Sequence, residues 1–341
     1  MDGGGANAMS NFTDPAILFF VFGVLAGALK SNLEIPQPIS RFLSLYLLMA
    51  LGLKGGFALA QSGLTSDVLI SLGAALAMAF GVPLLGYGVL RRFLSGFDAA
   101  AIAATYGSVS AVTFITASQY LDNHNVAFGG HMAAAMALME SPAIVFAVLM
   151  ANHVRRRMNT PLDPAMARQI QTRSSGHNPP LRSILHEALT DGAQLLLLGA
   201  MLIGWVTGPE GQTAMKPFSV DLFKGMLAFF LLDMGVVTAR NMGQLKGQSP
   251  WLVVYALLGP LCHASLALLL AKGLGMSAGN GALLMVLSAS ASYIAVPAVI
   301  RHAIAEANPS IYFGMSLGLT FPFNILIGIP LYVSLAQRFL V

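Results

Sequence analysis

Two short segments, one in each half of the chain, contain a pair of serines separated by one residue and surrounded by other small residues. The residues concerned are Gly107, Ser108, Ser110 and Thr113 in the first segment, and Ser290, Ser292 and Tyr293 in the second. Serine hydroxyls donate hydrogen bonds, and a helix interrupted at such a segment would also present backbone N–H groups and the positive end of its dipole. This chemistry suits a small anion. The alternative is that the small residues only let helices pack closely, but the pattern recurs at matching central positions, which favours a binding site.

Carboxylates inside apolar segments are the second kind of candidate. Glu140 lies near the middle of one apolar segment, where an ionised side chain costs about 2.5–3.5 kcal/mol, and Asp233 lies inside another. Asn324 lies in the region of the second half that corresponds to Glu140. Sodium takes oxygen ligands, so Glu140, Asp233 and Asn324 are predicted cation ligands, and Glu140 is alternatively a proton carrier. Lys54 is interpreted as a structural partner of Asp233 or as a side chain that extends toward the membrane interface.

The elements that would hold these residues are membrane-spanning helices. The 341 residues are 56% hydrophobic and only 9% charged, with a mean hydropathy of +0.73, whereas about a quarter of the residues of a soluble domain are charged. A spanning helix needs about 20 apolar residues. Ten runs near that length fall at 15–29, 41–61, 68–90, 98–118, 128–151, 189–207, 219–240, 252–271, 281–302 and 311–335. The two serine segments lie in the fourth and ninth runs, and these two helices are predicted to be discontinuous there, while the helix containing Glu140 and Pro142 is expected to be broken by its proline.

Several classes of function are excluded by composition and motifs. The basic residues lie in short loops rather than on one face with interleaved aromatic side chains, which argues against nucleic-acid binding. The single cysteine, Cys262, rules out an intramolecular disulfide and a cysteine-based metal site. The sequence has no phosphate-binding lysine motif, and it has no nucleophile–base pair or metal-ligand set. The chain is therefore not predicted to be an enzyme or to use a cofactor other than a coupling sodium ion.

The distribution of Lys and Arg predicts how the helices are oriented. With the N-terminus outside, most of the 18 basic residues fall in loops on the inner side, as is typical of cytoplasmic loops. The one long loop, 152–188, is basic and contains prolines, and it is interpreted as a cytoplasmic linker. It separates a five-helix repeat over 1–151 from a second over 189–341. An odd number of spans in each repeat places the second upside down relative to the first. We therefore expect an all-α inverted repeat in a bacterial inner membrane with both termini outside.

Several segments resemble the sodium-dependent bicarbonate transporter family first known from cyanobacteria. They are Gly52-Leu-Lys-Gly-Gly56, Tyr106-Gly-Ser-Val-Ser110, Met139-Glu-Ser-Pro142, Leu232-Asp-Met-Gly235, Ser290-Ala-Ser-Tyr-Ile-Ala295 with Pro297 and Arg301, Glu306-Ala-Asn-Pro-Ser310, and Phe321-Pro-Phe-Asn324 with Gly328-Ile-Pro330. The resemblance covers nearly the whole chain. It implies a ten-helix inverted repeat, a homotrimer, and sodium-coupled uptake of bicarbonate, which would bind between the two discontinuous helices.

The resemblance also bears on partners and on the branch of the family. A PII-like signalling protein docks on the cytoplasmic side of cyanobacterial members, so the same kind of partner is implied here. The cyanobacterial pattern has an aspartate where Glu140 stands and a helix richer in Gly, Ser and Thr around Ala111 and Val112. The sequence therefore resembles a non-cyanobacterial branch.

These observations predict a sodium-coupled symporter that imports bicarbonate or a similar small monoanion by alternating access. Two alternatives stay open. The first is a transporter coupled to protons, or a transporter of a different small anion. The second is a membrane sensor or docking platform that recruits a cytoplasmic protein through loop 152–188 without transporting a solute.

Overall fold

The computed structural model describes residues 14–158, 192–243, 249–304 and 306–340, and within these ranges the chain is helical and contains no strand. Seven of the described segments are long and apolar enough to cross a membrane. The ten predicted runs exceed this number for two reasons. One segment, Gly192–Met242, contains two of the predicted runs, and the helices Pro15–Ala28 and Ala278–Ala289 are apolar but shorter than a full span. The predicted linker 152–188 lies largely outside the described residues.

The described residues of the first half of the chain form six helices. They are α2 (Pro15–Ala28), α3 (Gln37–Ser62), α4 (Ser66–Leu90), α5 (Gly96–Gly107), α6 (Ala111–Asn123) and α7 (Met132–Met158). Their starts follow local capping chemistry: the Asp14 carboxylate accepts the N–H of Ala16 at 2.8 Å to begin α2, and the Ser95 hydroxyl accepts the N–H of Asp98 at 3.1 Å to begin α5. α7 runs without interruption through Pro142, so the expected proline break is wrong. A single proline removes one helical hydrogen bond, and neighbouring helices in a membrane protein can support the gap.

The second half contains more irregular helices. Its elements are α10 (Gly192–Lys216), the π-helical turn η1 (Pro217–Asp221), α11 (Phe223–Met242), α12 (Pro250–Gly273), α13 (Ala278–Ala289), α14 (Ala295–Ala303), α15 (Pro309–Phe313), η3 (Gly314–Thr320), α16 (Phe321–Phe323), η4 (Asn324–Gly328) and α17 (Ile329–Phe339). The helical backbone of α10 is interrupted by a kink at Gly208, directly after the predicted end of its apolar run. The φ of 54° at Gly208 lies in the left-handed region that glycine tolerates.

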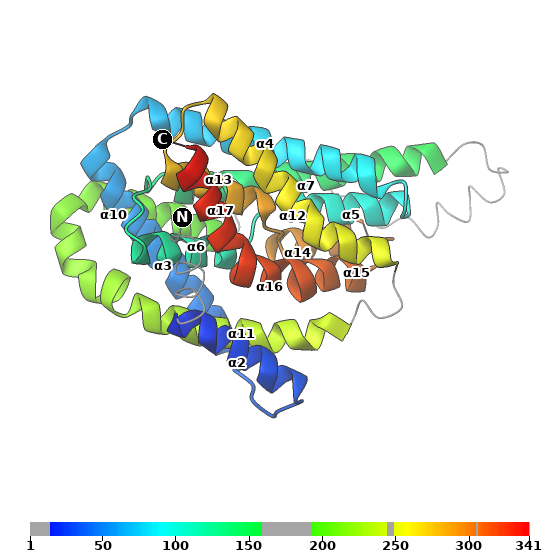
Figure 1. Ribbon diagram of the computed structural model, residues 1–341, viewed down its shortest axis with the longest axis horizontal. Coiled ribbons are helices and arrows are strands. Elements are labelled where there is room, and N and C mark those ends of the chain that lie inside the picture. The colour runs from blue at the N-terminus through cyan, green and yellow to red at the C-terminus, as the bar shows by residue number, and fades with distance from the viewer. Residues whose placement is uncertain (1–13, 159–191, 244–248, 305, 341) are drawn as a thin grey trace.

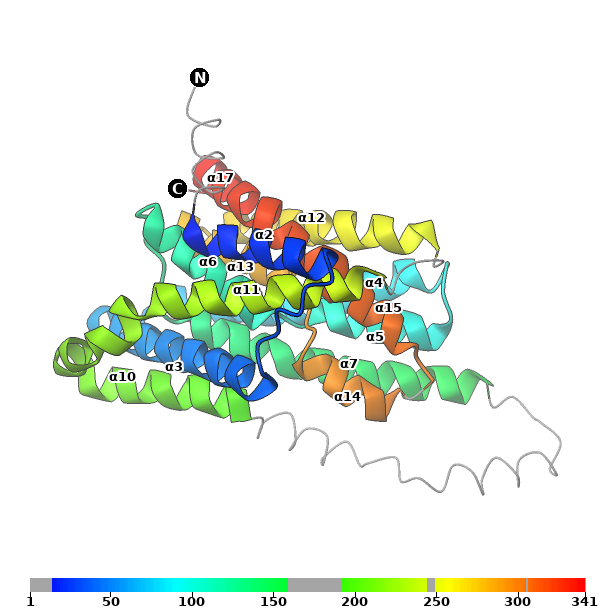
Figure 2. The same cartoon turned by 90° about the horizontal axis from the view of Figure 1, so that it is seen from below.

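Two helix pairs pack with their backbones in contact. α3 lies along α10 and α2 lies along α11, as both views show (Figure 1 and Figure 2). Glycines make these approaches possible: a Cβ atom at Gly56 of α3 would lie 2.1 Å from a carbonyl oxygen of α10, and one at Gly23 of α2 would lie 2.2 Å from a carbonyl oxygen of α11. The closeness of the backbones explains why small residues recur along these helices.

The two half-length helices α5 and α13 form the most enclosed part of the molecule. Each has 12 residues, and nearly all of these residues are buried. The chain leaves the helical conformation directly after each of them, at Ser108–Ser110 and at Ser290–Ile294, before α6 and α14 begin. Both predicted interruptions are therefore present, and both lie inside the protein, where irregular backbone can find polar partners.

Candidate functional site

The two interruptions are hydrogen-bonded to each other. The backbone N–H of Ser110 donates to the Ser290 hydroxyl at 3.0 Å, and the backbone N–H of Ser292 donates to the carbonyl oxygen of Thr105 at 2.8 Å. The second bond also satisfies a carbonyl group that the last turn of α5 leaves without a helical partner. The two serine segments, distant in sequence, thus meet in the interior of the protein.

Ser110 is the residue that begins α6, and its hydroxyl is oriented by this role. Its oxygen accepts the backbone N–H of Thr113 at 3.2 Å and the Thr113 hydroxyl at 2.9 Å. These two bonds use both lone pairs of the oxygen, so the Ser110 O–H acts as a donor. The Tyr293 hydroxyl donates to the sulfur of Met234 at 3.8 Å. Ser110 therefore offers a hydrogen-bond donor rather than an acceptor at the interruption.

The remaining small residues support the backbone around the interruptions. A Cβ atom at Gly107 would lie 2.6 Å from the ring of Pro83 on α4, which explains the glycine at the end of α5. The Ser290 hydroxyl donates to the carbonyl oxygen of Leu287 at 2.9 Å while it accepts the Ser110 N–H. Ser108 is completely buried, and its hydroxyl has no hydrogen-bond partner among the described residues. None of these three residues lines the cavity described next.

A cavity of ≈ 240 Å³ lies beside the interruptions and brings four of the predicted residues together. Ser110, Ser292, Tyr293 and Glu140 all line it. The other lining residues come from α3, from the start of α6, from α7, from the start of α10 and from α14, and most of them are apolar. A mostly apolar cavity with a few convergent polar groups is the usual form of a small-solute site.

Glu140 is the only charged residue among those that line this cavity. Its carboxylate accepts a hydrogen bond from the side-chain amide of Gln194, at the start of α10. The contact joins α7 to α10, the helix that packs along α3. Gln194 was not among the predicted site residues, because an amide near the end of an apolar run gives no signal until its partner is known.

The other two predicted cation ligands lie outside the cavity. Asp233 on α11 is buried and accepts a hydrogen bond from the Ser40 hydroxyl on α3. Asn324 donates its amide N–H to the carbonyl oxygen of Ala289 at 2.9 Å and accepts the Tyr332 hydroxyl at 3.0 Å. Asn324 thereby satisfies the last carbonyl group of α13. The backbone N–H of Ser292 does the same for the carbonyl group of Thr105 in the last turn of α5. Its arrangement fits a helix-capping role, and its role as a cation ligand stays a prediction.

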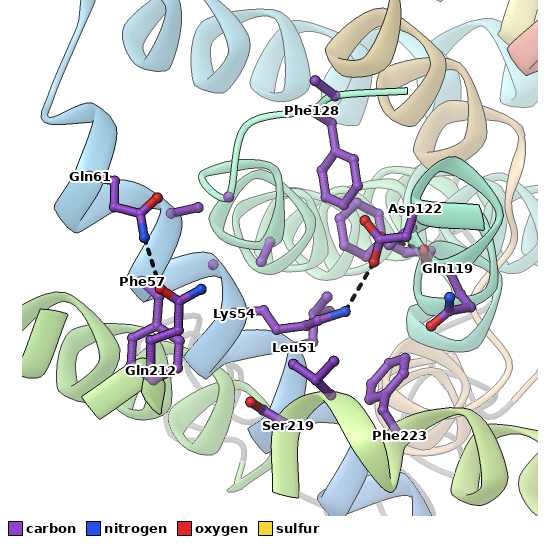
Figure 3. Close-up of a pocket in the computed structure, with 18 of the residues that line it drawn as sticks. Leu51, Lys54, Phe57, Gln61, Gln119, Asp122, Phe128, Gln212, Ser219 and Phe223 are labelled. Atoms are coloured by element: carbon purple, nitrogen blue, oxygen red, sulfur yellow. Dashed lines mark hydrogen bonds and ion pairs between the residues drawn. The ribbon is translucent and has the colours of Figure 1, made fainter. Parts of the chain in front are cut away.

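Lys54 pairs with a carboxylate other than the one considered from the sequence. Its ammonium lies 3.0 Å from the carboxylate of Asp122, in the last turn of α6, and not beside Asp233. Figure 3 shows the two side chains pointing toward each other across a second cavity, which has a volume of ≈ 300 Å³. Asp122 was missed because it lies at the end of a helix, where an acidic residue usually faces solvent.

A chain of apolar helices, two of them interrupted around a partly polar internal cavity, defines a multi-pass membrane protein of the transporter class. The family model described as the Na⁺-dependent bicarbonate transporter superfamily matches residues 15–337. The chain therefore belongs to this superfamily, and that membership implies transport rather than catalysis. No curated protein matches the chain.

Proposed function

We propose that the protein is a sodium-coupled symporter that imports bicarbonate or a similar small monoanion by alternating access. The observation that carries the proposal is the cavity beside the interruptions, which the hydroxyl-bearing residues Ser110, Ser292 and Tyr293 line together with Glu140. Membership of the Na⁺-dependent bicarbonate transporter superfamily supports bicarbonate and sodium as the solutes.

The charge of the cavity gives a physical reason for coupling. Its lining contains one carboxylate and no Lys, Arg or His. An anion alone would be repelled by Glu140, because like charges in a poorly solvated site destabilise each other. A sodium ion bound at the carboxylate removes this repulsion and adds an attractive charge. Anion and cation are therefore expected to bind together, which is the requirement for symport.

The helix arrangement supports an inverted repeat of five and five spans. In such a repeat α2 corresponds to α10, and α3 corresponds to α11. The symmetry that exchanges the two halves therefore converts the contact between α2 and α11 into a contact between α10 and α3, and both contacts are present. α5 and α13 have the same length, and each begins at a serine whose hydroxyl accepts the N–H of the residue three positions on. Inverted repeats with discontinuous helices that meet near the membrane centre are typical of secondary transporters.

The remaining features of the proposal come from the family resemblance and the basic loops. The protein is proposed to lie in a bacterial inner membrane as a homotrimer, with both termini outside. In both views α2 begins and α17 ends at the same end of the helix bundle, as this orientation requires (Figure 1 and Figure 2). A PII-like regulator is proposed to bind on the cytoplasmic side.

The sodium gradient provides the driving force in this proposal. A tenfold gradient is worth about 1.4 kcal/mol. One sodium ion with one bicarbonate ion moves no net charge, so the membrane potential adds nothing. A second sodium ion would add about 2.3 kcal/mol per 100 mV. The voltage dependence of uptake therefore distinguishes the two stoichiometries.

Uptake of labelled bicarbonate into proteoliposomes tests the proposal. Sodium and proton gradients are imposed separately, and counterflow against other small anions gives the selectivity. We expect uptake driven by sodium, and we expect Ser292→Ala to lower it. Uptake driven only by protons would assign Glu140 to proton transfer. The sensor or docking alternative would be favoured if the purified protein moved no anion under either gradient and deletion within 159–188 abolished function in cells.

A further inference from the structure

The second cavity follows the first along the helices α3, α6 and α7, which contribute to the lining of both. On α3, Ser44 and Leu48 line the first cavity, and Leu51 and Lys54 line the second. These positions are three or four residues apart and therefore share one face of the helix. The same succession holds on α6 and α7. On these helices the first cavity is lined by Ala111, Val112, Met136, Ala137, Glu140 and Ile144, and the second by Phe114, Ser118, Gln119, Asp122 and Ala133.

The second cavity has a distinct polar lining. Lys54, Asp122, Gln119 and Ser219 face it, together with the Gln61–Gln212 pair, whose amides are hydrogen-bonded at 2.9 Å (Figure 3). Phenylalanine rings form much of the rest. A volume of ≈ 300 Å³ holds about ten water molecules at the density of the liquid. An anion of a few atoms can therefore enter this space together with part of its hydration shell.

Lys54 is held at the cavity by the helix that carries it. On either side of it, Gly52 and Gly56 bring α3 into backbone contact with α10, so this stretch of α3 has little freedom to move independently of α10. The Lys54 ammonium crosses to Asp122 on α6 and also lies 4.9 Å from the centre of the Phe223 ring. The aromatic face supplies a second favourable contact that persists when the carboxylate moves away.

Asp122 is placed where the helix itself disfavours it. It lies in the last turn of α6, and the C-terminal end of a helix carries the negative end of the dipole. The side chain of Lys54 is 29% exposed and that of Asp122 is 41% exposed, so water screens their attraction. The pair is therefore weak enough for another anion to exchange with the carboxylate.

We infer that the second cavity is an entry site for the transported anion, at which Lys54 receives a small oxyanion and Asp122 is the carboxylate that the anion replaces. In the proposed orientation this cavity lies on the outer side of the first. The inference rests on the proposed function and deepens it, because it assigns a receiving group to the path that leads to the interruptions.

Paired substitutions test the entry site by the sign of their effects. Lys54→Met removes the receiving charge, and we expect the KM for bicarbonate uptake to rise about tenfold. Asp122→Asn removes the competing carboxylate, and we expect the KM to fall about threefold. A purely structural ion pair predicts the same direction for both variants, since either one breaks it. Opposite directions therefore support the entry site, and a common direction, or no change in either variant, overturns it.

The matched control is Lys224→Met. Lys224 also carries its charge to the end of α6, where it donates to the Asn123 side chain at 2.8 Å, but it does not line the cavity. We expect this variant to leave the KM unchanged, and a rise equal to that of Lys54→Met would overturn the inference in favour of a general surface-charge effect. Lys54→Arg retains the charge and is expected to restore the KM. If Lys54→Met does not fold, the direction of the Asp122→Asn effect decides.

A binding measurement separates this inference from the proposed function. The melting temperature of the purified protein is followed in sodium bicarbonate and in sodium gluconate at equal sodium concentration. We expect the bicarbonate concentration for half-maximal stabilisation to rise in Lys54→Met and to fall in Asp122→Asn. These opposite shifts without any uptake would refute the symporter proposal and retain the anion site. Normal sodium-driven uptake with no such shifts would refute the anion entry site and retain the symporter proposal.

Discussion

Replacing Glu140 by glutamine removes the negative charge from the cavity beside the interruptions while it keeps the length of the side chain. The carboxylate accepts a hydrogen bond from the amide of Gln194. A glutamine at position 140 can accept the same bond through its carbonyl oxygen, so the contact between α7 and α10 is retained. The variant therefore tests charge with little change in shape.

The expected magnitude follows from the kind of interaction that is lost. Interactions with a charged group contribute about 1.5–3 kcal/mol, compared with about 0.5–1.5 kcal/mol for a neutral pair. A sodium ion that loses a carboxylate ligand and keeps an amide oxygen loses the difference of about 1–1.5 kcal/mol and should therefore bind about 5- to 13-fold more weakly. The KM for the anion should rise as well at a fixed sodium concentration, because the two solutes bind together in the proposed mechanism.

The assay is the sodium dependence of bicarbonate uptake in proteoliposomes. The sodium concentration for half-maximal uptake is compared between the wild-type protein and Glu140→Gln. Glu306→Gln is the control, because it removes a carboxylate that is engaged by Arg155 and does not line the cavity. An unchanged sodium dependence in Glu140→Gln would refute the reasoning. If uptake by the wild-type protein depended on a proton gradient and uptake by Glu140→Gln did not, Glu140 would be identified as a proton carrier.

Three further predictions concern the helices around the site. Gly56→Ala should destabilise the protein by about 1–3 kcal/mol in thermal unfolding, because the new methyl group would lie 2.1 Å from a backbone oxygen of α10. The control is Gly73→Ala, which should not destabilise the protein because no atom lies near the new methyl group. Ser290→Ala should cost about 1–3 kcal/mol by leaving a buried N–H without its acceptor, and a melting temperature equal to that of the wild type would contradict this. The hydrogen bond with Arg155 lowers the pKa of Glu306 below its ordinary value of 4.5, so the stabilising contribution of this pair is complete above that pH and is lost as the pH falls through the lowered pKa. The difference in melting temperature between the wild type and Glu306→Gln should accordingly be present at about pH 7 and decrease as the pH falls through the lowered pKa.

The apolar runs were sufficient to predict most of the helices, because the thickness of a bilayer and the lack of charged residues leave few other structures. The interruptions were predictable too, since Ser and Gly at the centre of an apolar run weaken a helix. The π-helical turns over 314–328 and the kink at Gly208 were not predicted. Such irregularities depend on which neighbouring groups accept or donate the displaced hydrogen bonds, and a linear pattern does not contain this information.

The candidate site was predictable only in part for the same reason. The cost of burying a charge singled out Glu140, and the structure places it at the cavity. Its partner Gln194 and the carboxylate of Asp122 could not be recognised, because their significance comes from residues more than 50 positions away in the sequence. Lys54 was identified as unusual, but its partner depended on the crossing of α3 and α6, which no local pattern determines.

The succession of the two cavities along α3 has an electrical consequence. Leu48 lines one cavity and Leu51 the other, so the layer of side chains that separates them is about 4.5 Å thick at a rise of 1.5 Å per residue. With water in both cavities, most of the transmembrane voltage falls across this layer rather than across the whole bilayer. An ion that advances by less than one helical turn would then experience nearly the full value of about 2.3 kcal/mol per 100 mV. A small displacement would therefore make the cycle steeply sensitive to voltage whenever net charge is moved.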